Sequence, residues 1–227
     1  MFHVKPSQSD YDQLNTYYQM MIEKNKVMNL TGITDPDEVV LKHFADSLAI
    51  ACITDLNKNM SLIDVGTGAG FPGLPIKICF PEVKVTLLDS LQKRLNFLNE
   101  VIDALNLNDI QCVHSRAEDG GRNPKLREQF DIAVSRAVAP LQVLVEYCLP
   151  YVKVGGSFIA YKTADAEEEV NKARKAIDKL GGGPVSIHRF SLYDSDIQRT
   201  LIKIDKIKST SNFYPRKAGM PSKKPLQ

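Results

Sequence analysis

The sequence has few cysteines and lacks the long apolar runs of a membrane protein. Its four cysteines, at positions 52, 79, 112 and 148, include no Cys-x-x-Cys pair, and no histidine stands where it could complete a metal set. This scatter excludes a zinc ribbon or a disulfide scaffold, so we expect no metal. No apolar stretch approaches the roughly 18 residues of a membrane span, and the first residues lack a signal-peptide pattern. We therefore expect a cytoplasmic protein with free thiols and no membrane partner.

The chain also lacks a large excess of either charge. Its 29 Lys and Arg against 27 Asp and Glu give a net charge of +2, too small to indicate a nucleic-acid partner by itself. The basic residues are unevenly placed, because from Arg199 to the end there are eight Lys or Arg and a single acidic residue, Asp205. Such a segment is typical either of an edge that contacts phosphates or of a solvated tail.

The first 56 residues follow a helical pattern. Apolar residues recur at intervals of three and four between Asp10 and Asn29, and a second helix is expected from Pro36 to Ile53, with Asp35 before the proline as a start signal. Two short amphipathic helices cannot bury their apolar faces alone. Residues 1–56 are therefore predicted to form a helical cap on the main domain.

From residue 57 onward, short apolar runs alternate with longer helical periods. We expect strands at 62–65, 83–88, 110–114, 132–135 and 157–161, with helices that include 93–105, 141–149 and 166–179. This alternation predicts parallel βαβ units. Two more extended stretches, 185–191 and 199–206, are joined so briefly that they should pair antiparallel. The predicted fold class is α/β, a doubly wound sheet of five parallel strands plus a C-terminal antiparallel hairpin over residues 57–208. A basic tail without regular structure follows over 209–227.

The strongest local signal is a glycine-rich bend after the first of these strands. Ile63-Asp64-Val65 leads into Gly66-Thr67-Gly68-Ala69-Gly70-Phe71-Pro72-Gly73, four glycines in eight residues. A chain that turns this sharply needs backbone dihedrals open to glycine, and absent side chains let a ligand approach the backbone. Open α/β sheets bind ligands at the carboxyl ends of their strands, so this bend predicts a cofactor site.

An acidic residue follows at the end of the next strand. Asp89 lies about twenty residues after the bend, the position of a carboxylate that accepts hydrogen bonds from ribose hydroxyls. The bend and this carboxylate fit S-adenosylmethionine and a nicotinamide dinucleotide equally well. A nicotinamide-dependent oxidoreductase is therefore an alternative at this point.

The order of the later parts favours S-adenosylmethionine. Ala117-Glu118 follows the third strand, where it can contact an adenine, and Pro140-Leu141 follows the fourth. A helix then leads to Lys153-Val154-Gly155-Gly156 and the fifth strand. This succession is typical of class I methyltransferases, which are Rossmann-like, and lies outside the dehydrogenase pattern.

Motifs along nearly the whole chain carry a more specific resemblance. They are Met28-Asn29-Leu30-Thr31, His43-Phe44-Ala45-Asp46-Ser47-Leu48, the stretch Asp64–Gly73, Asp89-Ser90 with Lys93-Arg94, Arg116-Ala117-Glu118-Asp119, Ser135-Arg136-Ala137-Val138-Ala139 and Tyr214-Pro215-Arg216-Lys217-Ala218-Gly219 with Pro221. In these the chain resembles the bacterial 16S ribosomal RNA guanine-N-7 methyltransferases, also called glucose-inhibited division protein B.

The resemblance implies an activity and a set of site residues. It implies methylation of the N-7 position of a guanine in 16S ribosomal RNA, with S-adenosylmethionine as cofactor and the RNA or the small ribosomal subunit as partner. Together with the glycine bend, the residues expected to contact the cofactor are Gly66, Gly68, Gly70, Phe71, Asp89, Ala117, Glu118 and Arg136. We expect a monomer.

The fourth strand suggests how the reaction proceeds. Base-directed amino methyltransferases often carry an Asn/Asp-Pro-Pro-Tyr run there, whereas this chain has Ser135-Arg136-Ala137-Val138. The N-7 atom of guanine has a free lone pair at neutral pH, so no general base is expected. Catalysis would depend on alignment, and Arg136 is the predicted catalytic residue, positioning either the guanine oxygen or the cofactor carboxylate.

Four basic residues are predicted to contact RNA. They are Lys162, Arg199, Arg216 and Lys217. His43 lies on the apolar face of the second helix, where a packed histidine is commoner than a catalytic one. A non-enzymatic ribosome-assembly factor that binds RNA on the same fold is the second alternative function.

Overall fold

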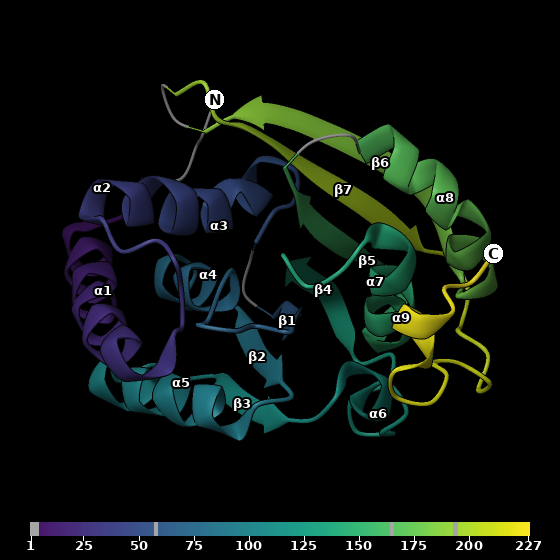
Figure 1. Cartoon of the computed structure of the whole chain (residues 1–227), viewed down its shortest axis with the longest axis horizontal. Coiled ribbons are helices and arrows are strands. Elements are labelled where there is room, and N and C mark those ends of the chain that lie inside the picture. Colours follow the sequence, from purple (N-terminus) through teal and green to yellow (C-terminus); the bar gives the residue numbers. More distant parts are fainter. Residues whose placement is uncertain (1–4, 57–58, 164–165, 193–194) are drawn as a thin grey trace.

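Seven strands form one mixed sheet at the centre of the molecule (Figure 1). The computed structural model describes residues 5–56, 59–163, 166–192 and 195–227. The strands are β1 (Ser61–Val65), β2 (Lys84–Asp89), β3 (Ile110–His114), β4 (Phe130–Arg136), β5 (Val152–Lys162), β6 (Gly182–Ser191) and β7 (Gln198–Lys206). Their order across the sheet is β3-β2-β1-β4-β5-β7-β6.

The pairing confirms the predicted fold class. Strands β1 to β5 all pair in parallel with one another, while β7 runs antiparallel to both β5 and β6. The chain moves outward from β1 to β2 and β3, then returns to β4 on the other side of β1. The point where the strand order reverses, between β1 and β4, is where open α/β sheets bind ligands at their carboxyl ends.

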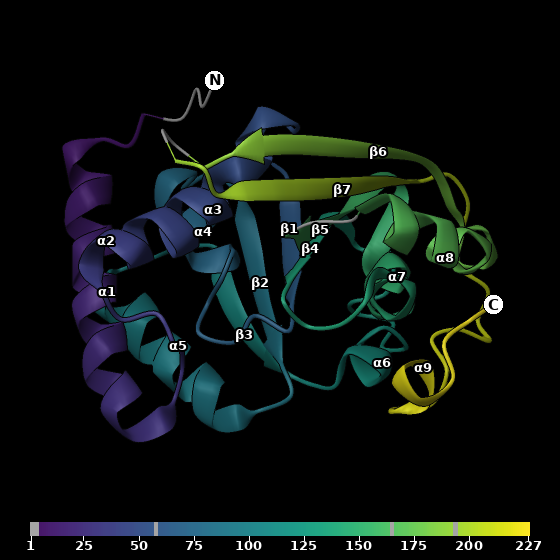
Figure 2. The same ribbon diagram turned by 45° about the horizontal axis from the view of Figure 1, so that its top comes forward.

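Helices cover both faces of the sheet (Figures 1 and 2). One apolar cluster packs α1 (Gln8–Met28), α4 (Gly73–Cys79) and α5 (Gln92–Ala104) on one face. A second cluster packs α7 (Leu141–Cys148) and α8 (Ala166–Lys179) on the other. The central strands β1, β2 and β4 are covered on both sides, so their residues are apolar in runs and mostly buried. The edge strands β3 and β6 are mostly half-buried or exposed.

The N-terminal segment is helical, as predicted. Helix α1 begins after Ser7, which forms a capping box with Asp10. The second helical stretch changes type along its length: α2 (Pro36–Val39), a π-helical turn (Val40–Ala45), α3 (Asp46–Leu48) and a 3-10 turn (Ala49–Cys52). The expected limit of this segment falls at residues 57–58, which lie outside the described residues, so the division at residue 56 stays a prediction.

The C-terminal tail differs from its prediction. We expected no regular structure over 209–227, but the structure has one helical turn there, α9 (Met220–Lys223), and the tail packs on the body of the protein. Leu226 is only 7% exposed. Prolines prevented a long helix but not a fixed path, because arginines of the main domain hold the tail's carbonyl groups.

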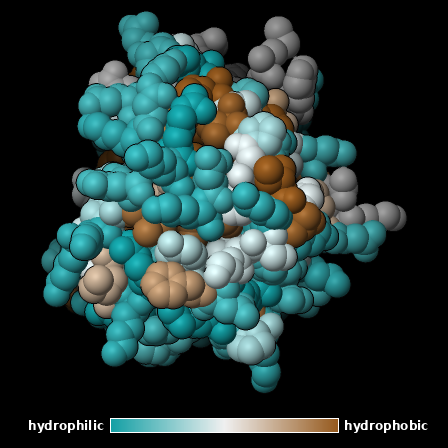
Figure 3. Space-filling view, turned by 90° about the vertical axis from the view of Figure 1, so that its right-hand side faces the viewer, coloured by the Kyte–Doolittle hydropathy of each residue, from teal (hydrophilic) through white to brown (hydrophobic). Residues whose placement is uncertain are grey.

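The surface around the tail is mainly hydrophilic. Figure 3 shows this side of the molecule, with hydrophilic side chains over most of it and apolar side chains in separate groups between them. None of the helices among the described residues is long and apolar enough to cross a membrane.

Candidate active site

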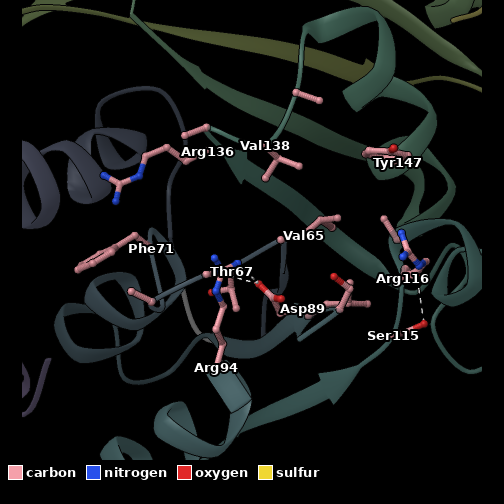
Figure 4. Close-up of a pocket in the computed structure, with 18 of the residues that line it drawn as sticks. Val65, Thr67, Phe71, Asp89, Arg94, Ser115, Arg116, Arg136, Val138 and Tyr147 are labelled. Atoms are coloured by element: carbon pink, nitrogen blue, oxygen red, sulfur yellow. Dashed lines mark hydrogen bonds and ion pairs between the residues drawn. The ribbon is translucent and has the colours of Figure 1, made fainter. Parts of the chain in front are cut away.

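A cavity of about 570 Å³ opens at the carboxyl ends of β1, β2 and β4. Its volume is in the range of small-molecule sites in proteins. Figure 4 shows Arg136 and Phe71 on one side, Tyr147 and Arg116 on the opposite side, and Asp89 between them. The residues predicted to contact a cofactor that line it are Gly66, Gly68, Phe71, Asp89, Ala117, Glu118 and Arg136.

The glycine bend forms the floor of this cavity. Gly66 and Gly68 have φ angles of +76° and +62°, in the left-handed region that favours glycine. The backbone N–H groups of Gly66 and Thr67 both donate to the Leu88 carbonyl oxygen, at 2.8 and 3.1 Å. A Cβ atom on Gly66 would lie 2.7 Å from a methyl group of Val138, which also lines the cavity. The bend is therefore held against β2 with its backbone exposed to the cavity.

Gly70 does not line the cavity, although it was predicted to contact the cofactor. Where we expected a cofactor contact, the structure packs Gly70 against the core: an added Cβ would lie 2.7 Å from Leu74 Cδ1 and 2.8 Å from the Tyr17 hydroxyl. Its φ of +110° also favours glycine. Gly70 thus lets α1 approach the bend, and the Tyr17 hydroxyl donates to the carbonyl oxygen of Ala69.

Asp64 holds the bend from beneath and was not among the predicted site residues. Its Oδ2 atom accepts from the Thr67 hydroxyl at 2.7 Å and from the Gly73 N–H at 2.9 Å. The side chain is fully buried, and Oδ1 has no hydrogen-bond partner among the described residues. This desolvation raises the pKa of Asp64 to about 6.

Asp89 faces the bend from the end of β2. Its Oδ2 atom accepts from the Gly68 N–H at 2.9 Å, and Oδ1 accepts from the Leu91 N–H at the same distance. Arg94 lies 3.5 Å from Oδ2. The carboxylate is thereby fixed at the cavity wall, at the position predicted for a ribose contact.

The Arg136 end of the cavity is completed by the N-terminal helices. The Arg136 guanidinium donates to Asp46 Oδ2 at 2.8 Å and to the Lys42 carbonyl oxygen at 3.2 Å, and Nη2 lies 3.2 Å from His43 Nδ1. It also lies over the Phe71 ring, 4.9 Å from its centroid. Among the described residues, Nε of Arg136 has no hydrogen-bond partner.

His43 stacks between these groups. Its ring lies 4.4 Å from the Phe71 ring, nearly parallel to it, and its Nε2 is 2.8 Å from the Thr31 hydroxyl. Burial, followed by the charge of Arg136, lowers the pKa of His43 to about 4. The imidazole is therefore neutral near pH 7 and can accept a hydrogen bond from Arg136.

A second cavity of about 440 Å³ adjoins the first. The two share His43, Arg136 and Ala137, whose φ of +57° is unusual for a residue other than glycine. Two residues predicted to contact RNA line it. Arg199 lies 3.2 Å from Asp46 Oδ1, and Lys162 donates to the Ala139 carbonyl oxygen at 3.0 Å and to Glu169 at 2.7 Å.

The other two predicted RNA contacts lie in the tail. Arg216 is engaged within the protein, because its guanidinium forms an ion pair with the buried carboxylate of Glu146 at 2.6 Å. Lys217 is exposed. The structure therefore brings Lys162 and Arg199 together with Arg136 but leaves Arg216 and Lys217 apart from both cavities.

Several cavity residues were not predicted from the sequence. Thr31, Tyr147 and Ser222 line the first cavity and Asp46 the second. Thr31 and Asp46 stand within motifs of the family resemblance, which was the available signal. No sequence signal pointed to Tyr147 or Ser222. Among the described residues, no group of three or more His, Cys, Asp or Glu could hold a metal ion.

Comparisons with known proteins agree on one family. The family model described as rRNA small subunit methyltransferase G matches residues 10–201. The chain is 54% identical to "Ribosomal RNA small subunit methyltransferase G" of Acetivibrio thermocellus over 99% of this chain and 92% of that protein. It is 51% identical to the protein of that name in a Geobacillus strain, over 95% of this chain and 90% of that protein.

Solved structures share the fold at low identity. A SAM dependent methyltransferase from Aquifex aeolicus has a TM-score of 0.54 and 18% identity, over 81% of this chain and 97% of that one. A methyltransferase from Pyrococcus furiosus has a TM-score of 0.55 and 21% identity, over 87% of this chain and 98% of that one.

Proposed function

Since this chain belongs to the rRNA small subunit methyltransferase G family, we propose that it transfers the methyl group of S-adenosylmethionine to the N-7 position of a guanine in 16S ribosomal RNA. One observation supports this most directly. The Asp89 carboxylate and the bare glycine backbone to which it is hydrogen-bonded line the same cavity of about 570 Å³. We further propose that the protein acts in the cytoplasm, as a monomer, on the RNA or on the small ribosomal subunit.

The cavity residues fit the proposed cofactor. A side chain at Gly66 would collide with Val138, 2.7 Å from an added Cβ, so the backbone stays bare where the bend lines the cavity. Asp89 can accept hydrogen bonds from both ribose hydroxyls, and the Ala117–Glu118 turn can contact the adenine. Phe71 and Arg136 border the opposite side, toward the methionine end. When bound, S-adenosylmethionine supplies a methyl carbon that is activated by its sulfonium sulfur.

Methyl transfer to N-7 needs alignment rather than a base. The lone pair of N-7 forms the new N–C bond as the C–S bond breaks, its electron pair stays on sulfur, and no proton leaves the guanine. His43 is neutral, and its two ring nitrogens are hydrogen-bonded to Thr31 and Arg136, so neither is free to act as a base in this step. The task of the site is to hold the two reacting atoms about 3 Å apart and in line.

Arg136 is the residue we propose for this task. Its guanidinium is fixed by Asp46, His43 and the Phe71 ring at the boundary of the two cavities. The remaining N–H groups can donate to the O6 atom beside N-7 or to the cofactor carboxylate, and a fixed donor stabilises developing charge without reorganisation.

The second cavity supports contact with RNA. Lys162 and Arg199 lie there beside Arg136 and Lys42. Asp46 and Glu169 line the same cavity and pair with three of these cations, but the positive charges outnumber them, which favours a phosphate. Exposed Lys217 is a peripheral contact in this proposal. Arg216 is the weakest of the four predicted RNA contacts, because it would have to leave Glu146.

Mapping the modified base tests the proposal. The protein is incubated with small ribosomal subunits that lack the modification and with S-adenosylmethionine carrying a labelled methyl group. We expect label on N-7 of one guanine of the 16S RNA, and none with Arg136→Gln. An oxidoreductase would instead bind NADH and ignore S-adenosylhomocysteine. An assembly factor would bind the RNA without transferring label, and either result would contradict the proposal.

A further inference from the structure

The cavity end opposite Arg136 is built partly by the C-terminal segment, defined here as residues 209–227. Glu118 follows β3, lines the cavity and is only 4% exposed. Its Oε1 atom accepts a hydrogen bond from the Gly219 N–H at 2.7 Å. Within the described part of the chain, this is the one hydrogen bond made by the Glu118 carboxylate. The other carboxylate oxygen is therefore available to a ligand, and the C-terminal segment fixes where it points.

Two more residues of this end meet across the same boundary. Ser222 from the C-terminal segment and Tyr147 from α7 both line the cavity. Burial is the main cause that raises the pKa of Tyr147, and the nearby Ser222 hydroxyl acts in the opposite direction. The Ser222 hydroxyl itself donates to the carbonyl oxygen of Gly219 at 3.2 Å. Figure 4 shows the Tyr147 ring beside the cavity, across from Asp89. An aromatic ring and a carboxylate oxygen suit the flat face and the amino group of an adenine.

Charge pairing attaches the C-terminal segment firmly to α7. The Glu146 side chain is completely buried. It accepts from the Arg216 backbone N–H at 2.8 Å and from the Arg216 guanidinium at 2.6 and 2.9 Å. Because a bidentate arginine is matched to a carboxylate in geometry as well as charge, this pair defines the position of the segment on α7.

Two arginines of the main domain hold the backbone of the segment. Arg127 donates to the carbonyl oxygens of Thr210 and Tyr214 at 2.6 and 2.8 Å. Arg122 donates to the carbonyl oxygen of Pro215 at 2.7 Å. Guanidinium groups aimed at successive carbonyls fix a path for a chain that has little regular structure. The anchors lie outside the cavity, whereas Ser222 lines it and Gly219 contacts Glu118, which also lines it.

We propose that the C-terminal segment is a wall of the cofactor site, with Ser222 beside the adenine and the Gly219 N–H orienting Glu118 toward it. This inference rests on the proposed function, because it takes S-adenosylmethionine as the ligand. It assigns the segment a role in cofactor binding in addition to any contact with RNA. By linkage, a ligand that touches the docked segment also stabilises its docking.

Matched substitutions in α9 test whether the C-terminal segment forms a wall of the cofactor site. Calorimetric titration with S-adenosylhomocysteine is suitable, since the chain has no tryptophan to report binding. Ser222→Phe places a ring at the cavity wall, and we expect the dissociation constant to rise at least about ten-fold. Lys223→Phe adds the same ring to the neighbouring exposed residue, which does not line the cavity, and should leave the constant unchanged.

Limited trypsin digestion provides a readout independent of substitution. S-adenosylhomocysteine should slow cleavage after Lys217 and Lys223 by about five-fold or more, because it stabilises the docked segment. Cleavage after Lys172 and Arg174 in α8, which face solvent, reports general unfolding and should slow less. Selective protection is the result expected for a wall that contacts the ligand.

The outcomes separate this inference from the function on which it rests. If the wild-type protein does not bind S-adenosylhomocysteine, the proposed function fails. If the wild type binds it, but Ser222→Phe binds equally well and the C-terminal segment gains no selective protection, the result supports the cofactor site and contradicts the proposal that the C-terminal segment forms one of its walls. A ten-fold loss confined to Ser222→Phe, or selective protection of the segment, supports the wall.

Discussion

The two ends of the cavity are built by the same scheme with opposite charges. At one end, the cation Arg136 extends from β4 and is held by Asp46 and His43 of the N-terminal helices. At the other end, the anion Glu118 follows β3 and is held by the Gly219 N–H of the C-terminal segment. In each case the sheet positions the charge, and a terminal part of the chain fixes its orientation. A ligand between them would thus contact the core and both terminal segments.

Gly66→Asp should have the largest effect, because the bend lies between the two ends. An added Cβ would meet Val138 at 2.7 Å, and the carboxylate would project into the space of the ligand. We expect S-adenosylhomocysteine binding to fall below detection in calorimetry. Gly155→Asp is the matched control: Gly155 also has a positive φ, of +89°, but an added Cβ meets nothing within 4 Å. That variant should lose about 1 kcal/mol of stability and bind normally.

Arg216→Met tests how strongly the C-terminal end is anchored. The variant leaves the buried Glu146 carboxylate without its cation, so the free energy of unfolding in urea should fall by roughly 3 to 5 kcal/mol. Adding Glu146→Gln removes the unpaired charge and keeps an acceptor for the backbone N–H, and should restore part of the loss. A single variant as stable as the wild type would show that the pair does not anchor the segment.

Asp46→Asn tests the N-terminal end. It removes the charge that holds both Arg136 and Arg199, at 2.8 and 3.2 Å. Misplacing an aligned group costs about 100-fold in rate, so we expect kcat to fall by up to that factor while S-adenosylhomocysteine binding changes less. Asp205→Asn, which breaks a longer pair with Lys203, is the control. Equal losses of kcat in both variants would contradict a specific role for Asp46.

The pH dependence of stability should give the smallest effect. Because the pKa of His43 is lowered to about 4, the unfolded chain takes up this proton first, and stability falls as pH drops from about 6.5 to 4. Asp64 acts oppositely: its pKa, raised to about 6, makes the folded state take up a proton first, which adds stability as pH falls.

Comparing the wild type with His43→Gln isolates the histidine, because Asp64 is present in both. The difference in unfolding free energy between the two proteins should decline, as pH falls from 6.5 to 4, by on the order of 2 kcal/mol. The expected change is smaller than the free energy that the full pKa shift of His43 would give, because the ring borders two cavities open to solvent, which screens its charge. Urea unfolding at several pH values measures it, and a constant difference would place the imidazole in a more polar site.

Local patterns were enough to predict the frame of the molecule. Alternating strands and helices indicated the parallel strands, and the short link after β6 indicated the antiparallel pair. Gly66, Gly68 and Asp89 line one cavity, because the carboxyl ends of neighbouring parallel strands meet at one edge of a sheet, while their contact with a cofactor stays a prediction. These inferences concern residues near in sequence or linked by a strong topological rule.

Partners distant in the chain were not predictable in the same way. Gly70 belonged to the cofactor motif by spacing, yet α1 approaches it on the side away from the cavity. Arg216 stood in a basic tail, and only docking on α7 revealed the buried carboxylate of Glu146 beside it. Sequence spacing cannot distinguish a glycine that makes room for a ligand from one that makes room for a packed helix. Nor can it distinguish an arginine in solvent from one paired with a carboxylate.

The sequence by itself determined the sheet, the bend and the residues that carry charge at the strand ends, because hydrophobic period and glycine content act over short distances. Only the tertiary structure decided which groups hold those charges. Asp46 reaches Arg136, and the Gly219 N–H reaches Glu118, across 90 and 101 residues of sequence respectively. Such pairs form because both ends of the chain fold back onto the carboxyl edge of the sheet, where buried charges require partners that no local pattern specifies.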